Sequence, residues 1–218
     1  MYDLEEWEIW DTYPQHRLWF NKLYLAYTLG YKCGPGGYPP SSSNYYVVRP
    51  IYNLPGMGLG SSLKWIPEGE RSSVPPGYFW CEFLSGSHYS TVYKWDGLWV
   101  PEVSWVGYND SSNFTKFSKW ERSNYYPPVP KELDVLQDVK YINIEFKGNN
   151  PIEVHLRASG NPDGSISTKY NEFIPVWKED KLDIDFFEEQ GYVFIPNSID
   201  MDDVVSYISS TRLGFLVK

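Results

Sequence analysis

The stretch "INIEFKGNNPIEVHLR" at residues 142–157 contains two short runs with the alternation of β-strands, joined by a lysine, a glycine and two asparagines. Successive residues of a strand point to opposite faces, so the second run has one polar and one apolar face. The polar face carries Glu153, His155 and Arg157. The apolar face, which we expect to turn toward the core, carries Ile152, Val154 and Leu156. The stretch therefore predicts an antiparallel hairpin with its polar chemistry on one side.

Pairing of the two runs would bring Glu145 close to Glu153. Two carboxylates about 4 Å apart repel each other by roughly 1 kcal/mol in water, and by several kcal/mol in a cleft. Such a pair persists where it shares a proton, pairs with arginine or binds a cation, and carboxylates are the usual protein ligands of Mg²⁺. The simpler interpretation is two exposed glutamates on an edge hairpin, each near Lys147 or Arg157.

A second polar site is the stretch "VVRPIYNLPGMGLGSS" at residues 47–62, where a β-rich run ends at Arg49 and a glycine-rich loop follows. Glycine lets backbone N–H groups approach a phosphate closely, and arginine can hold phosphate oxygens with two parallel hydrogen bonds. A Walker loop needs Gly-Lys-Ser/Thr, but this loop has Gly60-Ser61-Ser62. A dinucleotide fingerprint needs its third glycine where Ser61 stands, followed by a helix, and neither is present. We expect a glycine flap between two strands, with a plain turn as the simpler interpretation.

A third site, "FWCEFLSGSHYS" at residues 79–90, is a predicted strand carrying Glu82 that runs into a Leu-Ser-Gly turn. By itself, this stretch predicts no more than a strand with an exposed glutamate. The best helix candidate lies within residues 14–37, with Gly30 as its C-cap, and shorter helices are expected at 131–139 and 202–210. Further antiparallel strands are expected at 44–54, 63–68, 88–109 and 212–218, the third of these containing an Asp96-Gly97 hairpin turn. Residues 110–130 and 158–172 are expected to be mostly loop.

Taken in this order, the three sites resemble the ATP-grasp superfamily. "VVRP" is similar to a strand end whose basic residue contacts nucleotide phosphates, and "NLPGMGLGSS" to the flexible loop that closes over the triphosphate. "FWCEFLSG" resembles the hinge strand that lies against adenine and ribose. "INIEF" and "IEVHLR" match an acidic residue on one strand and Glu-x-Asn-x-Arg on the next. The resemblance covers roughly residues 45–160.

The resemblance implies a role for each matching residue. Arg49 stands where the family has a phosphate-binding lysine, and Arg157 matches the arginine that contacts phosphate or the acyl-phosphate; these two are the predicted catalytic residues. The implied cofactor-binding residues are Arg49, Gly58, Gly60, Ser61, Glu82, Phe83 and Leu84. The implied metal ligands are Glu145, Glu153 and His155, the last in place of the family's asparagine. Lys22 could match the family's earlier lysine, but no motif surrounds it.

The resemblance also implies a fold and a reaction. The fold would be α+β, with two small lobes of mostly antiparallel sheet and few helices around a nucleotide cleft. The chain, residues 1–218, would be one such unit, with lobes at approximately 1–78 and 79–218. The reaction would join a small-molecule or peptide carboxylate to an amine through an acyl-phosphate, with ATP and Mg²⁺ as cofactors.

The bulk composition limits the other classes. The net charge is −9, and no basic run is present, so general nucleic-acid binding and binding to anionic membranes are disfavoured. No apolar run approaches the ~20 residues of a membrane span, and the acidic N-terminus lacks an apolar signal-peptide region. We therefore expect a cytoplasmic protein in which Cys33 and Cys81 are free thiols. The sequence leaves the oligomeric state and the identity of both substrates open.

Two other functions fit parts of the sequence. Aromatic residues make up 18% of the chain, and five tryptophans crowd the β-rich region: Trp80, Trp95, Trp99, Trp105 and Trp120. Exposed aromatic platforms would suit a non-catalytic β-rich module that binds carbohydrate or protein, although core packing is the simpler explanation. The chain could also be a nucleotide-binding ATP-grasp protein without ligase activity. The replacement of the family's lysine by Arg49 and of its asparagine by His155 would fit that alternative.

Overall fold

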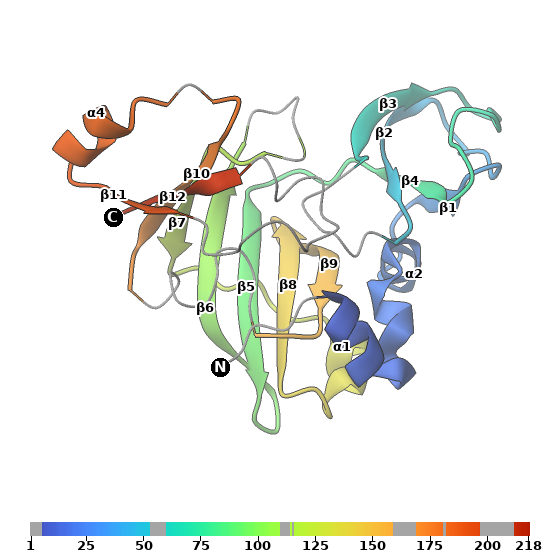
Figure 1. Cartoon of the computed structure of the whole chain (residues 1–218). Helices are drawn as coiled ribbons and strands as arrows, with labels where there is room; N and C mark the ends of the chain where they lie inside the picture. Colours follow the sequence, from blue (N-terminus) through green and yellow to red (C-terminus); the bar gives the residue numbers. More distant parts are fainter. Residues whose placement is uncertain are drawn as a thin grey trace.

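Two antiparallel sheets lie side by side and are joined by the segment that follows the last strand of the first sheet (Figure 1). The computed structural model describes residues 6–52, 60–109, 114, 116–158, 169–180, 182–196 and 212–218. The small sheet has the order β1-β4-β2-β3 and contains β1 (Cys33–Pro35), β2 (Asn44–Pro50), β3 (Ser62–Ile66) and β4 (Tyr78–Glu82). With few helices beside these sheets, the predicted α+β class is confirmed.

The large sheet has the order β11-β12-β10-β7-β6-β5-β8-β9, and every strand pairing in it is antiparallel among the described residues. Its strands are β5 (His88–Trp95), β6 (Trp99–Tyr108), β7 (Lys119–Ser123), β8 (Tyr141–Lys147), β9 (Asn150–His155), β10 (Glu172–Trp177), β11 (Val193–Pro196) and β12 (Arg212–Val217). The described helices are α1 (Glu6–Thr12), η1 (Pro14–Phe20), α2 (Lys22–Thr28), η2 (Lys131–Leu136) and α4 (Ile184–Glu189).

One face of the β8–β9 hairpin packs into the main core. Ile144 on β8 and Val154 on β9 are opposite each other in register and are both buried. Residues of the short helices cover them: Ile9 of α1, Trp19 and Phe20 of η1, Leu25 of α2, and Leu133 and Leu136 of η2. Because the apolar residues of the hairpin face this core, its polar residues face the other side of the sheet.

The register of the hairpin differs from strict alternation at one residue. Glu145 pairs with Glu153, but the next residue of β8, Phe146, pairs with Pro151, so Ile152 is an extra residue in a β-bulge. The expectation that Ile152 faces the core with Val154 is therefore wrong. A bulge locally re-aims the strand, and Ile152 instead lines the cleft described below.

The predicted long helix is broken in two. Its first part is the 3₁₀ helix η1, and α2 starts anew because the side chain of Asn21 accepts a hydrogen bond from the Tyr24 backbone N–H at 2.8 Å. Asparagine favours such an N-cap over a helix interior. The apolar face that we predicted is also partly wrong, since Leu18 is 55% exposed and Tyr27 is 77% exposed. The helix ends before Gly30, as expected.

Several other elements were predicted correctly and some were missed. The strands β2 to β6, β8, β9 and β12 fall in their predicted segments, and the β5–β6 hairpin turns at Asp96–Leu98. The segment 131–139 forms the 3₁₀ helix η2, and the helix expected at 202–210 lies outside the described residues. The prediction of loop for residues 110–130 is wrong at β7, and β10, β11 and α4 were not predicted.

Candidate functional site

A cleft lies between the two sheets and encloses about 1160 Å³ of space, part of it open to solvent. Strands of both sheets line it, together with α2 and the segment that follows β4. Seven of the residues predicted to bind cofactor or metal are among its lining: Arg49, Ser61, Glu82, Phe83, Leu84, Glu145 and Glu153. Residues from distant parts of the sequence therefore meet in one hollow, as the predicted site requires.

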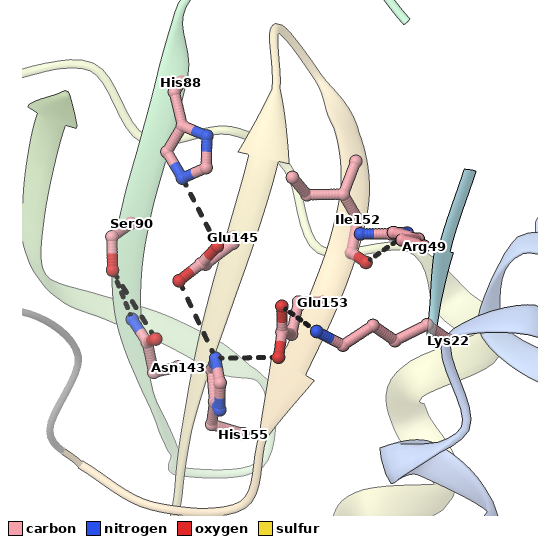
Figure 2. A network of polar contacts seen from close by, with 9 residues as sticks. All are labelled: Lys22, Arg49, His88, Ser90, Asn143, Glu145, Ile152, Glu153 and His155. Atoms are coloured by element: carbon pink, nitrogen blue, oxygen red, sulfur yellow. Dashed lines mark hydrogen bonds and ion pairs between the residues drawn. The ribbon is translucent and has the colours of Figure 1, made fainter. Parts of the chain in front are cut away.

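Glu145 and Glu153 are direct cross-strand partners on β8 and β9 (Figure 2). Their carboxylates are 21% and 13% exposed. Ligand atoms of Glu145, Glu153 and His155 all lie within 4.8 Å of one another, so one cation can contact all three. We call these three residues, with the neighbouring Lys22 and His88, the carboxylate end of the cleft.

Three cationic or imidazole groups already surround the carboxylate pair. The Lys22 ammonium is 2.7 Å from Oε2 of Glu153, and the lysine residue is only 5% exposed. Nε2 of His88 lies 3.3 Å from Glu145, and Nε2 of His155 lies 3.8 Å from both glutamates. The repulsion between the two carboxylates is therefore offset by groups on α2, β5 and β9.

These neighbours decide the ionisation of Glu145. Burial by itself raises the pKa of this carboxyl, but the imidazoles of His155 and His88 outweigh burial and hold the pKa well below its usual range. Nearby, burial lowers the pKa of Lys147 against the opposing effect of Glu145. Glu145 is therefore an anion at neutral pH, which is the form that binds a metal ion.

Arg49 links the two sheets at the same place. It lies on β2 of the small sheet, and its Nη2 donates a hydrogen bond of 2.8 Å to the backbone oxygen of Ile152, the bulge residue of β9 (Figure 2). Its guanidinium also lies 5.3 Å above the centroid of the Phe79 ring. A guanidinium has five N–H donors, so donors remain for an anion in the cleft.

The segment after β4 is fixed against the turn of the β8–β9 hairpin. Gly86 has a φ of 116°, and a Cβ at this position would lie 2.8 Å from the backbone of Gly148 in that turn. Only glycine permits this approach. At the start of the segment, Glu82 accepts a hydrogen bond from the backbone N–H of Lys32 at 2.8 Å. The predicted hinge strand is therefore held next to the carboxylate pair by backbone contacts.

The remaining predicted residues are placed less directly. Gly58 lies outside the described residues, and Gly60 has a φ of 74° beside the cleft-lining Ser61. Arg157 follows the end of β9 and is not among the residues that line the cleft. Its implied contact with phosphate stays a prediction.

Three cleft residues near the carboxylate pair had not been assigned a role from the sequence: Lys22, His88 and Lys147. Lys22 had been considered, but nothing in its local sequence pointed to Glu153, which is more than a hundred residues away in the chain. His88 pairs with Lys147 across β5 and β8, and that pairing brings both side chains to the face of Glu145. The alternation of β5 could have given the face of His88, but not its neighbour.

The tryptophans do not form an exposed platform. Trp80, Trp99, Trp105 and Trp120 are all at most 9% exposed, and Trp95 packs against the main core. The simpler expectation, that these side chains fill cores, is therefore the correct one for this group. Trp120 differs from the others because it also lines the cleft.

The cleft is more positive than the chain as a whole. Among its described lining residues, Lys22, Arg49, Lys147 and Arg212 are cations, and Glu82, Glu145 and Glu153 are anions. The Cys81 thiol also lines the cleft, and burial raises its pKa to about 12, so it is neutral at physiological pH. An excess of positive charge in a chain of net charge −9 favours an anionic ligand.

Solved structures share the fold of this chain. An L-amino acid ligase from Bacillus licheniformis matches 93% of this chain and 67% of its own, with 11% identity and a TM-score of 0.56. An N5-carboxyaminoimidazole synthetase from Staphylococcus aureus, solved with ADP, matches 92% of this chain and 67% of its own, with 12% identity and a TM-score of 0.52. The chain therefore has the fold of the ATP-grasp superfamily.

Other comparisons add little to this assignment. An ATP-grasp superfamily protein from Archaeoglobus fulgidus matches 76% of this chain and 60% of its own, with 14% identity and a TM-score of 0.45. The chain thus spans 60% to 67% of the length of these three structures. No protein-family model and no curated protein matches the sequence.

Among the described residues, no helix has the length and apolar content needed to cross a membrane.

Proposed function

We propose that this protein is an ATP-dependent ligase that joins a carboxylate to an amine through an acyl-phosphate, with Mg²⁺ bound by Glu145 and Glu153. The observation that carries the proposal is the placement of these two carboxylates opposite each other, in a cleft that also contains Arg49 and the predicted hinge strand. The ADP bound to the Staphylococcus aureus synthetase supports a nucleotide as the ligand of such a fold.

The residues of the carboxylate end fit a divalent cation. Two carboxylates supply the hard oxygen ligands that Mg²⁺ prefers, and His155 adds a nitrogen within the same 4.8 Å cluster. Bound Mg²⁺ would neutralise phosphate charge and orient the phosphates for transfer. The depressed pKa of Glu145 keeps its carboxylate ready for this role without the loss of a proton.

The chain's own cations would then position the reactants. Arg49 reaches from β2 to the hairpin, where it binds the backbone oxygen of Ile152, and it has N–H donors left for phosphate oxygens. Lys147 lines the same region and would stabilise the anion of the acyl-phosphate. Phosphoryl transfer depends mainly on such positioning and on electrostatic stabilisation, so the site requires no activated nucleophile of its own.

A nucleotide-binding protein without ligase activity is the second candidate, and one contact favours it. The ammonium of Lys22 is buried against Glu153 at 2.7 Å and neutralises one of the two carboxylates. If this ion pair persists with nucleotide bound, Glu153 is not free to bind a metal ion. Turnover would then be absent although nucleotide binds.

The test is calorimetric titration with a non-hydrolysable ATP analogue, with and without Mg²⁺, followed by an assay for ADP release in the presence of amino acids and hydroxylamine, which traps acyl-phosphates. We expect Mg²⁺-dependent binding that weakens at least about tenfold in Glu145→Gln. Glu102→Gln, an exposed carboxylate on β6, is the matched control and should bind normally. Absence of nucleotide binding with and without Mg²⁺ would refute the proposal, and binding without ADP release would favour the second candidate.

A further inference from the structure

Five aromatic residues line the cleft at the opposite end from the β8–β9 hairpin. They lie just before β7, on β7, on β10 and on β12. In Figure 1 these strands are at the left of the large sheet, whereas β8 and β9 are at its right. We call them the aromatic wall: Phe117, Trp120, Phe173, Trp177 and Phe215. The proposed ligase reaction assigns none of them a role.

The aromatic wall is held rigidly by ring contacts. Trp120 and Phe173 are cross-strand partners whose rings stack with centroids 6.0 Å apart and an interplanar angle of 7°. The ring centroids of Phe117 and Trp120 are 4.4 Å apart, and those of Phe215 and Phe173 are 5.6 Å apart. Such aromatic pairs prefer defined offsets and angles, so the cluster is rigid. Trp120, Phe173, Trp177 and Phe215 are at most 5% exposed, and Phe117 is the partly exposed ring that faces the cleft.

Gly107 makes room for the wall. It pairs with Trp120 on β7, and a Cβ at Gly107 would lie 2.7 Å from a ring carbon of Phe117 and 2.8 Å from a ring carbon of Trp120. A side chain here would push both rings away from the strand. The glycine therefore leaves room for both rings against β6, beside the cleft.

The wall is continuous with the carboxylate end. His88 pairs with Gly107, and its imidazole is 4.7 Å from the Phe117 ring and 5.6 Å from the Trp120 ring. The same imidazole lies 3.3 Å from the carboxylate of Glu145. The His88 side chain therefore contacts both the aromatic wall and the carboxylate end of the cleft. The two regions are close enough for a single small molecule to contact both.

The wall also has polar groups suited to an anion. The indole N–H of Trp177 is buried and has no hydrogen-bond acceptor among the described residues. The guanidinium of Arg212, which lines the cleft, lies 4.5 Å from the Phe215 ring centroid. The ammonium of Lys116 lies 5.2 Å from the Trp177 ring centroid and is paired with the carboxylate of Glu179. A buried donor without an acceptor is unfavourable, and an anionic ligand oxygen would satisfy it.

We propose that the aromatic wall binds the side chain of an aromatic amino acid, free or at the end of a peptide, and so selects the substrate of the ligase. The ring would pack on Phe117 and Trp120, while the anionic group would meet Trp177 and Arg212. This inference rests on the proposed function for its link to catalysis. The adenine base of the nucleotide is a poorer occupant, because it carries no anionic group for the Trp177 indole N–H and the Arg212 guanidinium, whereas an amino acid carries a carboxylate beside its ring.

The first test is calorimetric titration of the whole chain with L-phenylalanine, L-alanine and L-phenylalaninamide. L-alanine lacks the ring, and the amide lacks the carboxylate. We expect L-phenylalanine to bind at least about fivefold more tightly than L-alanine, because ring packing contributes most of the difference. The amide should also bind about tenfold more weakly, because it loses a charge-assisted hydrogen bond. Equal binding of L-phenylalanine and L-alanine would overturn the proposal.

Two variants locate the binding to the wall. Phe117→Ala removes a partly buried ring. Trp177→Phe removes the N–H donor and part of the ring system but keeps an aromatic side chain, so this second variant is expected to fold. Each should weaken L-phenylalanine binding at least about threefold. Phe186→Ala, at an exposed ring on α4, is the matched control and should leave binding unchanged. Unchanged binding in both wall variants would overturn the proposal.

Titration with the ATP analogue separates this inference from the proposed function. If the wall selects the amino acid, Phe117→Ala should bind Mg²⁺ and the ATP analogue like the unmodified protein. Weaker analogue binding in this variant, with competition between adenosine and L-phenylalanine, would assign the wall to the base and overturn the inference. Binding of L-phenylalanine at the wall without any nucleotide binding would support the inference and refute the ligase.

Discussion

The carboxylate end and the aromatic wall lie on the same face of the large sheet, but different interactions hold them in place. At the carboxylate end, Glu153 is paired with the buried Lys22, and Glu145 with two imidazoles. In the aromatic wall, Trp120 and Phe173 belong to an apolar cluster whose rings contact one another directly. His88 is the residue that contacts both.

The difference has a consequence for how each end tolerates change. When one partner of a buried charge pair is removed, the free energy of unfolding falls by several kcal/mol, because the remaining charge stays buried without compensation. A packed ring cluster responds to shape instead, through cavities or overlap. At the carboxylate end, a substitution that removes a charge but keeps the side-chain shape should therefore lower stability strongly. At the aromatic wall, a substitution that adds an atom without changing the charge should do so.

The largest effect is expected from Glu153→Gln, which keeps the shape of the side chain and removes its charge. Lys22, only 5% exposed, would then be left without its carboxylate at 2.7 Å. The free energy of unfolding should fall by roughly 3–5 kcal/mol, as measured by urea denaturation. This single variant therefore perturbs stability as well as the proposed metal site, and for this reason Glu145→Gln is the better variant for the nucleotide titration.

Removal of both charges provides the control for this prediction. In Lys22→Met combined with Glu153→Gln, no uncompensated charge is left in the site, so most of the lost stability should return. If the double variant is as unstable as Glu153→Gln alone, the charge pair is not what holds the carboxylate end together.

An intermediate effect is expected from Gly107→Ala, which adds one methyl group beneath the aromatic wall. The new Cβ would lie 2.7 Å from Phe117 and 2.8 Å from Trp120, so both rings must move. Overpacking of this kind costs about 1–3 kcal/mol of unfolding free energy, and the near-ultraviolet circular dichroism of the tryptophans should change. Addition of Phe117→Ala to this variant should recover part of the loss; no recovery would show that the overlap lies elsewhere.

The smallest effect is expected from Glu121→Gln on β7. Hydrogen bonds from Lys119 and Tyr108 lower the pKa of Glu121 below its ordinary value, although the side chain is 34% exposed. A depressed carboxyl pKa stabilises the fold above the unfolded-state pKa of about 4.3. That contribution is lost as pH falls through the folded-state pKa. The loss on substitution should be under about 1 kcal/mol at pH 7, and it should vanish by acid pH in urea denaturation series.

Glu145→Gln sharpens the same comparison. Glu145 is less exposed than Glu121, and its pKa is held further below the usual range by His155 and His88. The acid side of the stability curve should therefore flatten more in Glu145→Gln than in Glu121→Gln. Equal flattening in the two variants would mean that the imidazoles do not stabilise the buried carboxylate.

The elements that carry the site motifs were predictable because their signals are local. Alternation of polar and apolar residues within 142–157 predicts the β8–β9 hairpin and the approach of Glu145 to Glu153, and both are present. The bulge at Ile152 was not predictable, because it depends on register against β8 and leaves no mark in the sequence.

The missed elements are those whose strand character comes from their neighbours. β7 reads "KWERS" and has little β-propensity, but it is paired on both sides, by β6 and by β10. β10 contains Pro175, which argues against a central strand, yet Pro175 pairs with Phe215 of β12. Because the aromatic wall is built on these strands, it could not be recognised in the sequence.

By itself, the sequence determined the order of the cleft motifs, the faces of the β8–β9 hairpin apart from the bulge residue Ile152, and the carboxylates at its centre. Those features depend on strand alternation and on residue chemistry, which act over a few residues. Only the tertiary structure decided that Lys22 meets Glu153, that His88 joins the two ends, and that the rings of three strands form one wall. These contacts join residues far apart in the chain, and the packing of whole sheets and helices, rather than any local preference, brings them together.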